Sequence, residues 1–510
     1  MNHLVIAPIL LPLLAGIIHL FGRNLAYHWR RGFSFAVLLG QIGLAAALLH
    51  AVSDGDILTY AVGNWPAPFG IVLVADRLSA WMLLVTAVLA LFPLIYASRG
   101  IDVSGRHFHI LYQLQLMGLN GAFLTGDLFN LFVFFEVLLL ASYGLILHGG
   151  GRLKTRAGLH YVVLNLCGSA LFLIAVGTLY GLFGTLNMAD LARKMASVSP
   201  ENLGPARAAG LLLFAVFALK AALLPLYLWL PAAYAQTSAP IAALFAIMTK
   251  VGAYSILRVM TLIFAGQAGG MLIEPWLLPL ALASLLIGLF GALAARALRE
   301  QVAYLVVASI GTLLTAFSLG SVAGIAAGLY YLPHTTFTAA ALFLLADRIA
   351  HGRGEQLADR FMPGPAMAGA PILGGLFFVS AILAVGLPPL SGFVGKFLLL
   401  RAALEHPHWP WIVGTVLSGG LLGLIALARS GSLLFFRTQP ASQDSTGHLP
   451  ATTAPTASFD AIALLPVFGL LALTIVLTVA AGPLYAFALA TAEQLLQPYQ
   501  YVHAVLGGQP

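Results

Sequence analysis

The sequence has few charged residues and a single cysteine. Charged side chains make up 8% of its 510 residues and hydrophobic side chains 60%, with a mean hydropathy of +0.97. No single soluble core of this size could hide that much apolar surface. The lone Cys167 excludes an internal disulfide and a CxxC pair, so nothing indicates iron–sulfur or zinc chemistry. The composition therefore predicts a polytopic integral membrane protein.

Motifs for nucleotide and redox chemistry are also missing. The sequence contains no P-loop, no Rossmann glycine pattern, no paired-histidine haem helix and no metal-ligand cluster. We therefore expect no cofactor, and the chain shows no sign of carrying electrons or hydrolysing nucleotides itself.

Long apolar segments predict an all-α fold of about 14 transmembrane helices rather than a barrel. The expected ranges are 3–21, 33–52, 78–98, 108–125, 128–148, 158–182, 209–230, 239–264, 274–295, 301–319, 321–348, 371–403, 410–436 and 459–481. Alternate loops hold 14 arginines and lysines, and the opposite loops hold 4. Because basic loops stay in the cytoplasm, both termini are predicted on the non-cytoplasmic side. The net charge of +7 thus reflects topology and implies no nucleic acid.

Three segments are predicted not to span the membrane. Residues 183–208 are expected to include a short interfacial helix on the outer side. Residues 438–458, rich in proline, serine and threonine, are predicted to form a polar cytoplasmic loop. The tail after Pro483 mixes aromatic and polar residues, as an interface-lying segment would.

Four ionisable residues lie inside apolar segments: Glu136, Lys220, Lys250 and Lys396. Counted from the expected helix starts, Glu136 lies about 13 Å, Lys220 roughly 16 Å and Lys250 about 15 Å into its helix, near the middle of a core about 30 Å thick. Such residues are costly in a bilayer and usually mark ion or proton pathways. The alternative is a static ion pair between Glu136 and one lysine.

Proline predicts breaks in two of these spans. Pro225 cannot donate to the carbonyl of Ala221, so the helix should fray beside Lys220; an ordinary proline kink is the alternative. The run 386–392, with Pro388 and Pro389, should break a second helix and bring Lys396 toward mid-membrane, although Lys396 could instead be a snorkelling anchor. Paired breaks of this kind are typical of repeat-built transporters.

Other polar residues in the spans are assigned simpler roles. His334 lies deep among hydroxyl side chains, and either a proton relay or a helix-packing hydrogen bond would explain it. The arginines at 258, 401 and 429 are predicted to be anchors near span ends. Asp76 and Asp127 are predicted to be helix caps.

Two stretches carry a family resemblance. Residues 126–144, GDLFNLFVFFEVLLLASYG, resemble the fifth span of the D subunit of the Mrp-type multisubunit Na⁺/H⁺ antiporters, and residues 219–234, LKAALLPLYLWLPAAY, resemble its seventh. The same family includes antiporter-like subunits of respiratory complex I and of membrane-bound hydrogenases. The resemblance extends over nearly the whole chain and implies an antiporter-like fold with two inverted five-helix repeats and broken helices in spans 7 and 12.

The resemblance also implies an organisation and a set of roles. It implies N-terminal helices at 1–107, proton-channel repeats at 108–264 and 265–437, the loop at 438–458, and a last span with its tail at 459–510. The implied relay has the ion pair Glu136–Lys220, then Lys250, with the terminal lysine Lys396. The late lysine disfavours the complex I subunit that carries glutamate there. Partner Mrp subunits and a bacterial cytoplasmic membrane location are implied too.

This chain departs from the family at two central positions. Relatives often have a lysine shortly after the histidine at 334, where this chain has Phe337-Thr338, and a histidine near 307–311 that is absent here. We therefore expect water to help bridge the relay from Lys250 through His334 to Lys396.

The hypothesis from sequence is proton translocation controlled by pairing, in exchange for Na⁺ or another monovalent cation. Approach of Glu136 favours the Lys220 ammonium, and separation favours release of its proton toward Lys250. One alternative is a proton-pumping subunit of an NADH:quinone oxidoreductase or membrane-bound hydrogenase complex. Another is a non-transporting assembly scaffold.

Overall fold

The computed structural model describes residues 3–264, 272–365, 367–437 and 460–507. Nearly all of its regular structure is helical. In chain order the α-helices are α1 (Ala7–Phe21), α2 (Tyr27–Ala51), α3 (Arg77–Ala97), α4 (Phe108–Leu124), α5 (Leu128–Ile146), α6 (Arg152–Phe183), α7 (Met188–Ala196), α8 (Pro200–Ala221), α9 (Trp229–Gln236), α10 (Ala239–Phe245), α11 (Met248–Leu262), α12 (Glu274–Ala294), α13 (Leu298–Ser318), α14 (Val322–Leu357), α15 (Ala370–Val385), α16 (Ser391–Ala403), α17 (Trp409–Gly431), α18 (Leu465–Val479), α19 (Ala481–Leu495) and α20 (Pro498–Leu506). The predicted loop 438–458 lies outside the described residues.

The described residues contain eleven helical segments that are long and apolar enough to cross a membrane. The shorter α1 and α4 and the α15–α16 pair correspond to three further predicted spans, so the predicted total of 14 is reached. The main shift in boundaries concerns the seventh span: α8 begins at Pro200 rather than at residue 209 and ends at Ala221.

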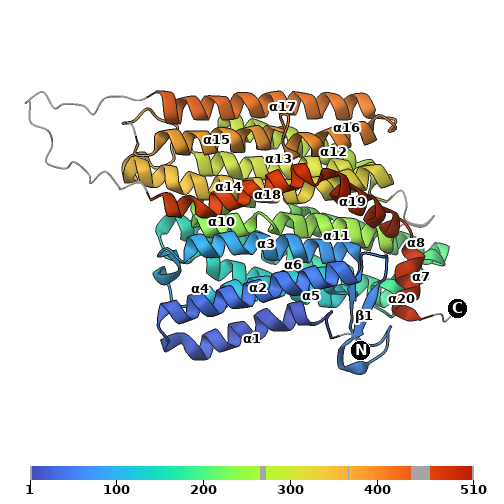
Figure 1. Ribbon diagram of the computed structural model, residues 1–510. Helices are drawn as coiled ribbons and strands as arrows, with labels where there is room; N and C mark the ends of the chain where they lie inside the picture. Colours follow the sequence, from blue (N-terminus) through green and yellow to red (C-terminus); the bar gives the residue numbers. More distant parts are fainter. Residues whose placement is uncertain (1–2, 265–271, 366, 438–459, 508–510) are drawn as a thin grey trace, which may run out of the picture.

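The long helices run side by side, and both chain ends lie at the same end of the bundle (Figure 1). The antiparallel hairpin of β1 (Leu58–Ala61) and β2 (Val72–Ala75) lies there too, and is the described exception to an all-α chain. The interfacial helix expected within 183–208 is α7, and it packs against α20 at this end. In the tail, α19 packs along α14 within the bundle instead of lying only at the interface.

Both predicted helix breaks are present. The chain leaves helical geometry between α8 and α9, and again between α15 and α16, where Gly386 has a φ of 82°. A further irregularity between α10 and α11 was not predicted: the N–H groups of Ala246 and Ile247 donate to the carbonyls three residues back instead of four, both at 3.3 Å. By contrast, α14 continues through Pro333.

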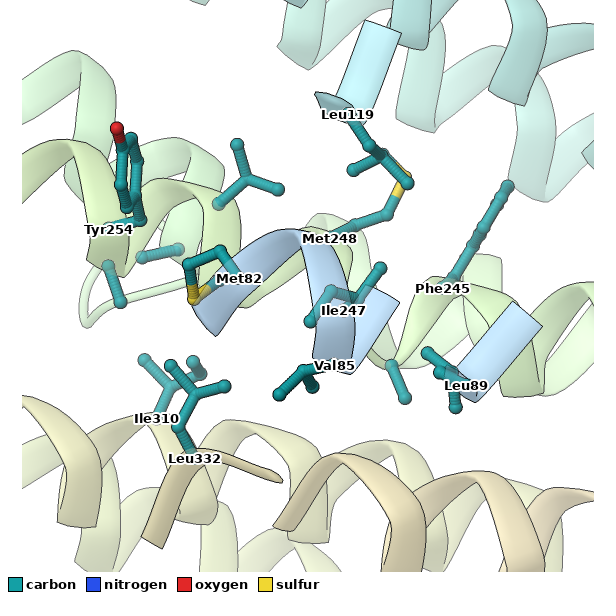
Figure 2. Close-up of a cluster of buried hydrophobic side chains, with 14 of the residues drawn as sticks. Met82, Val85, Leu89, Leu119, Phe245, Ile247, Met248, Tyr254, Ile310 and Leu332 are labelled. Atoms are coloured by element: carbon teal, nitrogen blue, oxygen red, sulfur yellow. The ribbon is translucent and has the colours of Figure 1, made fainter. Parts of the chain in front are cut away.

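Apolar side chains seal one side of the α10–α11 junction. Ile247 and Met248 lie among Met82 and Val85 of α3 and Leu119 of α4 (Figure 2). All five belong to one buried hydrophobic cluster. Beside this cluster, the buried Gln115 of α4 donates to Met248 Sδ at 3.1 Å.

Candidate functional site

The first part of the candidate site joins Glu136 of α5 to Lys220 of α8 through α6. Ser169 Oγ donates to Glu136 Oε1 and also to the backbone oxygen of Asn165, at 3.1 Å. The Lys220 ammonium lies 3.4 Å from Asn165 Oδ1 and 3.5 Å from Asn165 O. Among the described ion pairs, with nitrogen–oxygen distances of 4.0 Å or less, none joins Lys220 to Glu136. In place of an ion pair, the two residues are linked here through the Ser169 hydroxyl and the backbone carbonyl of Asn165.

Local sequence explains where these two residues lie. The Asp127 carboxylate accepts from Asn130 N at 2.8 Å and caps α5, as predicted, so Glu136 lies about two turns into the helix. Lys220 was expected well inside a helix, but it is the penultimate residue of α8 because the helix ends at Ala221. Its Nζ also lies 5.8 Å from the centre of the Phe135 ring, a cation–π contact.

The break after Lys220 satisfies its freed backbone groups with side chains. Leu224 N donates to Ser284 Oγ of α12 at 2.8 Å, and the Trp229 indole donates to Leu219 O at 2.9 Å. Irregular backbone at membrane depth is tolerated where protein or water satisfies it. Hydrogen bonds thus stabilise the break, and the bond to Ser284 joins the first half of the molecule to α12.

Lys250 of α11 is completely buried, and its Nζ has no hydrogen-bond partner among the described residues. Its helix approaches α8 very closely: a Cβ added to Gly252 would lie 2.3 Å from Ala221 N and 2.7 Å from Lys220 C. Only glycine permits this approach, which sets the Lys250 helix directly against the end of the Lys220 helix.

His334 of α14 lies against the second break. Its Nδ1 is 2.9 Å from Ser391 Oγ, the first residue of α16. A Cβ on Gly392 would lie 2.8 Å from His334 Nε2 and 2.3 Å from Leu383 O. The helix-packing hydrogen bond expected as an alternative is therefore present, and it fixes the ring beside the unwound segment.

Lys396 of α16 folds back across the same break. Its Nζ donates to Val385 O, the last residue of α15, at 2.6 Å. The last carbonyls of a helix lack intrahelical partners and attract cations. The predicted break thus places Lys396 at the C-terminal end of a half-helix.

A cavity of about 40 Å³ connects His334 with Lys396. Hydroxyl side chains line part of it: Ser309, Thr312, Thr335 and Thr338. A cavity needs roughly 10–15 Å³ for each water molecule, so this one has room for a few. Ser309 and Thr338 lie in the two stretches where the sequence departs from its family, and Thr338 Oγ1 has no partner among the described residues.

Sequence reasoning missed several participants and misassigned one. Asn165, Ser169 and Ser391 were not singled out, because serine and asparagine in apolar helices carry no distinctive pattern. Arg258 was predicted to be an anchor, but it is buried and pairs with Asp76 at 2.6 and 2.7 Å. This bidentate pair joins α11 to the start of α3 and lies outside the relay.

The described contacts do not form one continuous hydrogen-bonded chain. Glu136, Ser169, Asn165 and Lys220 are linked, and a hydrogen bond and a cavity surround His334 and Lys396. Among the described residues, no hydrogen bond joins Lys250 to either group. The geometry gives two polar sites with a buried, unpartnered amine on the helix between them.

Comparison with known proteins places the chain in a family. Residues 125–423 match the family model described as "NADH:quinone oxidoreductase/Mrp antiporter, TM". A probable K⁺/H⁺ antiporter D subunit of Rhizobium meliloti is 40% identical and aligns with 99% of this chain and 98% of its own length. The Na⁺/H⁺ antiporter D subunit of Alkalihalophilus pseudofirmus is 37% identical, with 99% and 100% covered.

A solved structure agrees with these relatives. A chain of the Mrp complex from Dietzia sp. DQ12-45-1b superposes with a TM-score of 0.87 at 30% identity, covering 99% of this chain and 100% of that one. The resemblance predicted from residues 126–144 and 219–234 is confirmed. The chain belongs to the NADH:quinone oxidoreductase/Mrp antiporter family of transmembrane subunits, on the branch of the antiporter D subunits.

Proposed function

We propose that this chain moves protons within a multisubunit monovalent cation/proton antiporter. The observation that carries the proposal is the set of amines at membrane depth: Lys220 and Lys250 are buried, and neither contacts a carboxylate in the described structure. D-subunit relatives support the antiporter assignment. Their names give K⁺ in one case and Na⁺ in another, so we propose a monovalent cation, with Na⁺ as the first to test.

The first half works by changing the distance between Glu136 and Lys220. We take the arrangement in which Ser169 holds Glu136 and Asn165 faces Lys220 Nζ as the separated state. A direct contact would favour the ammonium, whereas separation in a dry site favours the neutral amine. The pair would close when Lys220 exchanges its two long contacts with Asn165 for one with Glu136. Each cycle then loads and unloads one proton at Lys220.

The proton released from Lys220 passes to Lys250, which has no competing partner among the described residues. It continues through His334 and water in the 40 Å³ cavity to Lys396. Hydroxyl groups of Ser309, Thr312 and Thr338 would orient that water, since a hydroxyl both donates and accepts. Water thus takes the place of the lysine and histidine that this chain lacks.

The proposed organisation follows from the two broken spans. We assign residues 108–264 and 265–437 to two proton-channel repeats, each containing one break, with 1–107 and 459–510 as flanking parts. The arginine-rich connections, such as α1–α2 and α3–α4, lie at the opposite end of the bundle from the chain ends (Figure 1). Since basic loops face the cytoplasm, we place both termini outside.

The test is proton-coupled cation exchange in vesicles that carry the complete complex. Glu136→Ala and Lys220→Ala complexes should assemble but lose exchange. The matched control is Lys194→Ala, because Lys194 on α7 pairs with Asp190 at 3.2 Å outside the relay. Wild-type Na⁺ or K⁺ exchange by fully assembled Glu136 and Lys220 variants would reject the proposal.

The same test separates the two alternatives. A scaffold role predicts that alanine variants lose assembly in proportion to transport. A redox-driven pump predicts that exchange in vesicles requires an electron donor and acceptor. We favour antiport because relatives named as antiporter D subunits match this chain over nearly its whole length.

A further inference from the structure

A second site, which contains no relay residue, lies where α1 ends and α2 begins. A pocket of about 370 Å³ opens there. Its polar residues are His19 of α1 and Arg30 of α2, and its apolar residues include Ile18, Leu25, Trp29 and Phe33. The pocket therefore combines a cation with a largely hydrocarbon wall.

Arg30 is a buried cation with spare hydrogen-bonding capacity. It is 4% exposed, its Nη2 donates to Arg106 O at 2.8 Å, and its Nε has no partner among the described residues. No described carboxylate forms an ion pair with it. The neighbouring Arg31 differs, because Asp102 binds it with two contacts of 2.6 and 2.7 Å. The Arg30 guanidinium also lies 5.3 Å from the centre of the Tyr27 ring, a cation–π contact. Burying a charge without a counter-ion is costly, so Arg30 still calls for an anion.

A hydrogen-bonded chain fixes the other polar residue of the pocket. His19 Nε2 lies 2.8 Å from Ser34 Oγ, Ser34 Oγ lies 2.9 Å from His109 Nδ1, and His109 Nε2 lies 3.3 Å from Asp102 Oδ2. Burial by itself raises the pKa of Asp102, but hydrogen bonds from His109 and Arg31 outweigh burial and lower it to about 2. Asp102 is thus an anion already shared by Arg31 and His109, and it is not a partner for Arg30.

The exposed surface of the protein beside the pocket is apolar. Phe21 is 83% exposed, Trp29 68% and Ile18 52%. The first turn of α2 contains no acidic residue and its N-cap Ala26 makes no side-chain bond, so the positive end of the helix dipole is also uncompensated. The ligand that fits has a negative head and a long hydrocarbon part.

We propose that this pocket binds an anionic phospholipid, with its phosphate on Arg30 and its acyl chains along α1 and α2. Basic pockets between transmembrane helices are a recognised way to hold such headgroups. Ser34, His109 and Asp102 are positioning residues that fix His19 at the pocket wall. The proposal is independent of the proton relay.

The test uses the complete complex in phosphatidylcholine, titrated with phosphatidylglycerol, with bound lipid counted by native mass spectrometry. Arg30→Gln should weaken phosphatidylglycerol binding by about 10-fold, as expected for one charged hydrogen bond. Leu25→Trp should block the pocket without altering charge or core, since Leu25 is 58% exposed. Arg429→Gln is the matched control, because Arg429 is an exposed arginine that bonds Leu293 O.

Loss of binding in the Arg30 and Leu25 variants, but not in the control, supports the site. Wild-type affinity in both variants, or equal binding of phosphatidylcholine, overturns it. Inorganic phosphate alone is added in a separate experiment. If it displaces the lipid from the pocket, the lipid assignment is wrong. A crosslink from a photoreactive group at position 25 to another subunit, in place of lipid, would show a subunit interface instead.

Discussion

The two break-associated lysines hold their charge in different ways. Lys220 is the penultimate residue of α8 and makes long contacts of 3.4 and 3.5 Å to Asn165. Ser169 connects Asn165 to the carboxylate of Glu136. Lys396 lies on α16, after its break, and donates one short hydrogen bond of 2.6 Å to the carbonyl of the last residue of α15. The first lysine has only long contacts, which can be exchanged, whereas one short bond to a backbone carbonyl holds the second. We therefore propose that proton transfer is controlled in the first half of the chain, and that the second half delivers the proton.

The largest effect is expected from removing either amine. Lys220→Ala and Lys396→Ala should each reduce exchange by about 100-fold or more, within the range seen when a proton-transferring group is lost. Vesicle exchange rates, normalised to assembled complex, measure this. If only Lys220→Ala lost activity, the proton would not pass Lys396, and the proposed second half of the path would be wrong.

A second large effect should separate transport from stability. Lys250→Met keeps similar volume and removes a buried ammonium that has no described partner, so melting temperature should stay level or rise while exchange is lost. Thermal unfolding and exchange are measured on the same preparation. A matching fall in both would favour a structural role for Lys250.

An intermediate effect is expected at the bridge. Ser169→Ala removes the hydrogen bond to Glu136 and should slow exchange by about 10-fold, since hydrogen bonds to charged groups contribute about 1.5–3 kcal/mol. Thr178→Ala is the control, because Thr178 is an exposed hydroxyl of α6 that bonds only within its own helix in the described contacts. Equal rates for the two variants would mean that the bridge does not set the Glu136–Lys220 distance.

The smallest effect is expected in the second half. Thr338→Val preserves shape and removes one hydroxyl from the cavity, so it should slow exchange only about two- to fivefold, because other hydroxyls can still orient water. A loss as large as that of Lys220→Ala would show that Thr338 itself carries the proton. Rates in light and heavy water would then identify the slow transfer.

Much of this arrangement could be predicted from sequence because it depends on strong local signals. The length of the apolar segments predicted the spans, and Pro225 and Pro388–Pro389 predicted the two breaks. Ionisable residues inside apolar segments predicted the members of the relay. The irregularity at Ala246–Ile247 could not be predicted, since neither residue is a helix breaker. Its cause is tertiary. Tyr234 OH donates to Phe245 O at 2.8 Å, and the absence of a Cβ at Gly252 lets α11 pack closely against α8.

Contacts between distant segments could not be predicted from the sequence either. The bridge from Glu136 to Lys220 depends on two polar residues one helical turn apart on α6, and the Arg258–Asp76 pair joins residues 182 positions apart. Neither has a local pattern. Glu136 and Lys220 are linked indirectly in this arrangement for the same reason: the groups between them, the Ser169 hydroxyl and the Asn165 carbonyl, belong to a third helix.

The most direct test of the central claim is Lys220→Arg. Arginine keeps the positive charge but does not release its proton in proteins, so a static ion pair would tolerate it and a relay would not. We predict a fully assembled complex with normal melting temperature and no proton-coupled cation exchange in vesicles. Exchange at the wild-type rate would contradict the proposal that Lys220 carries protons.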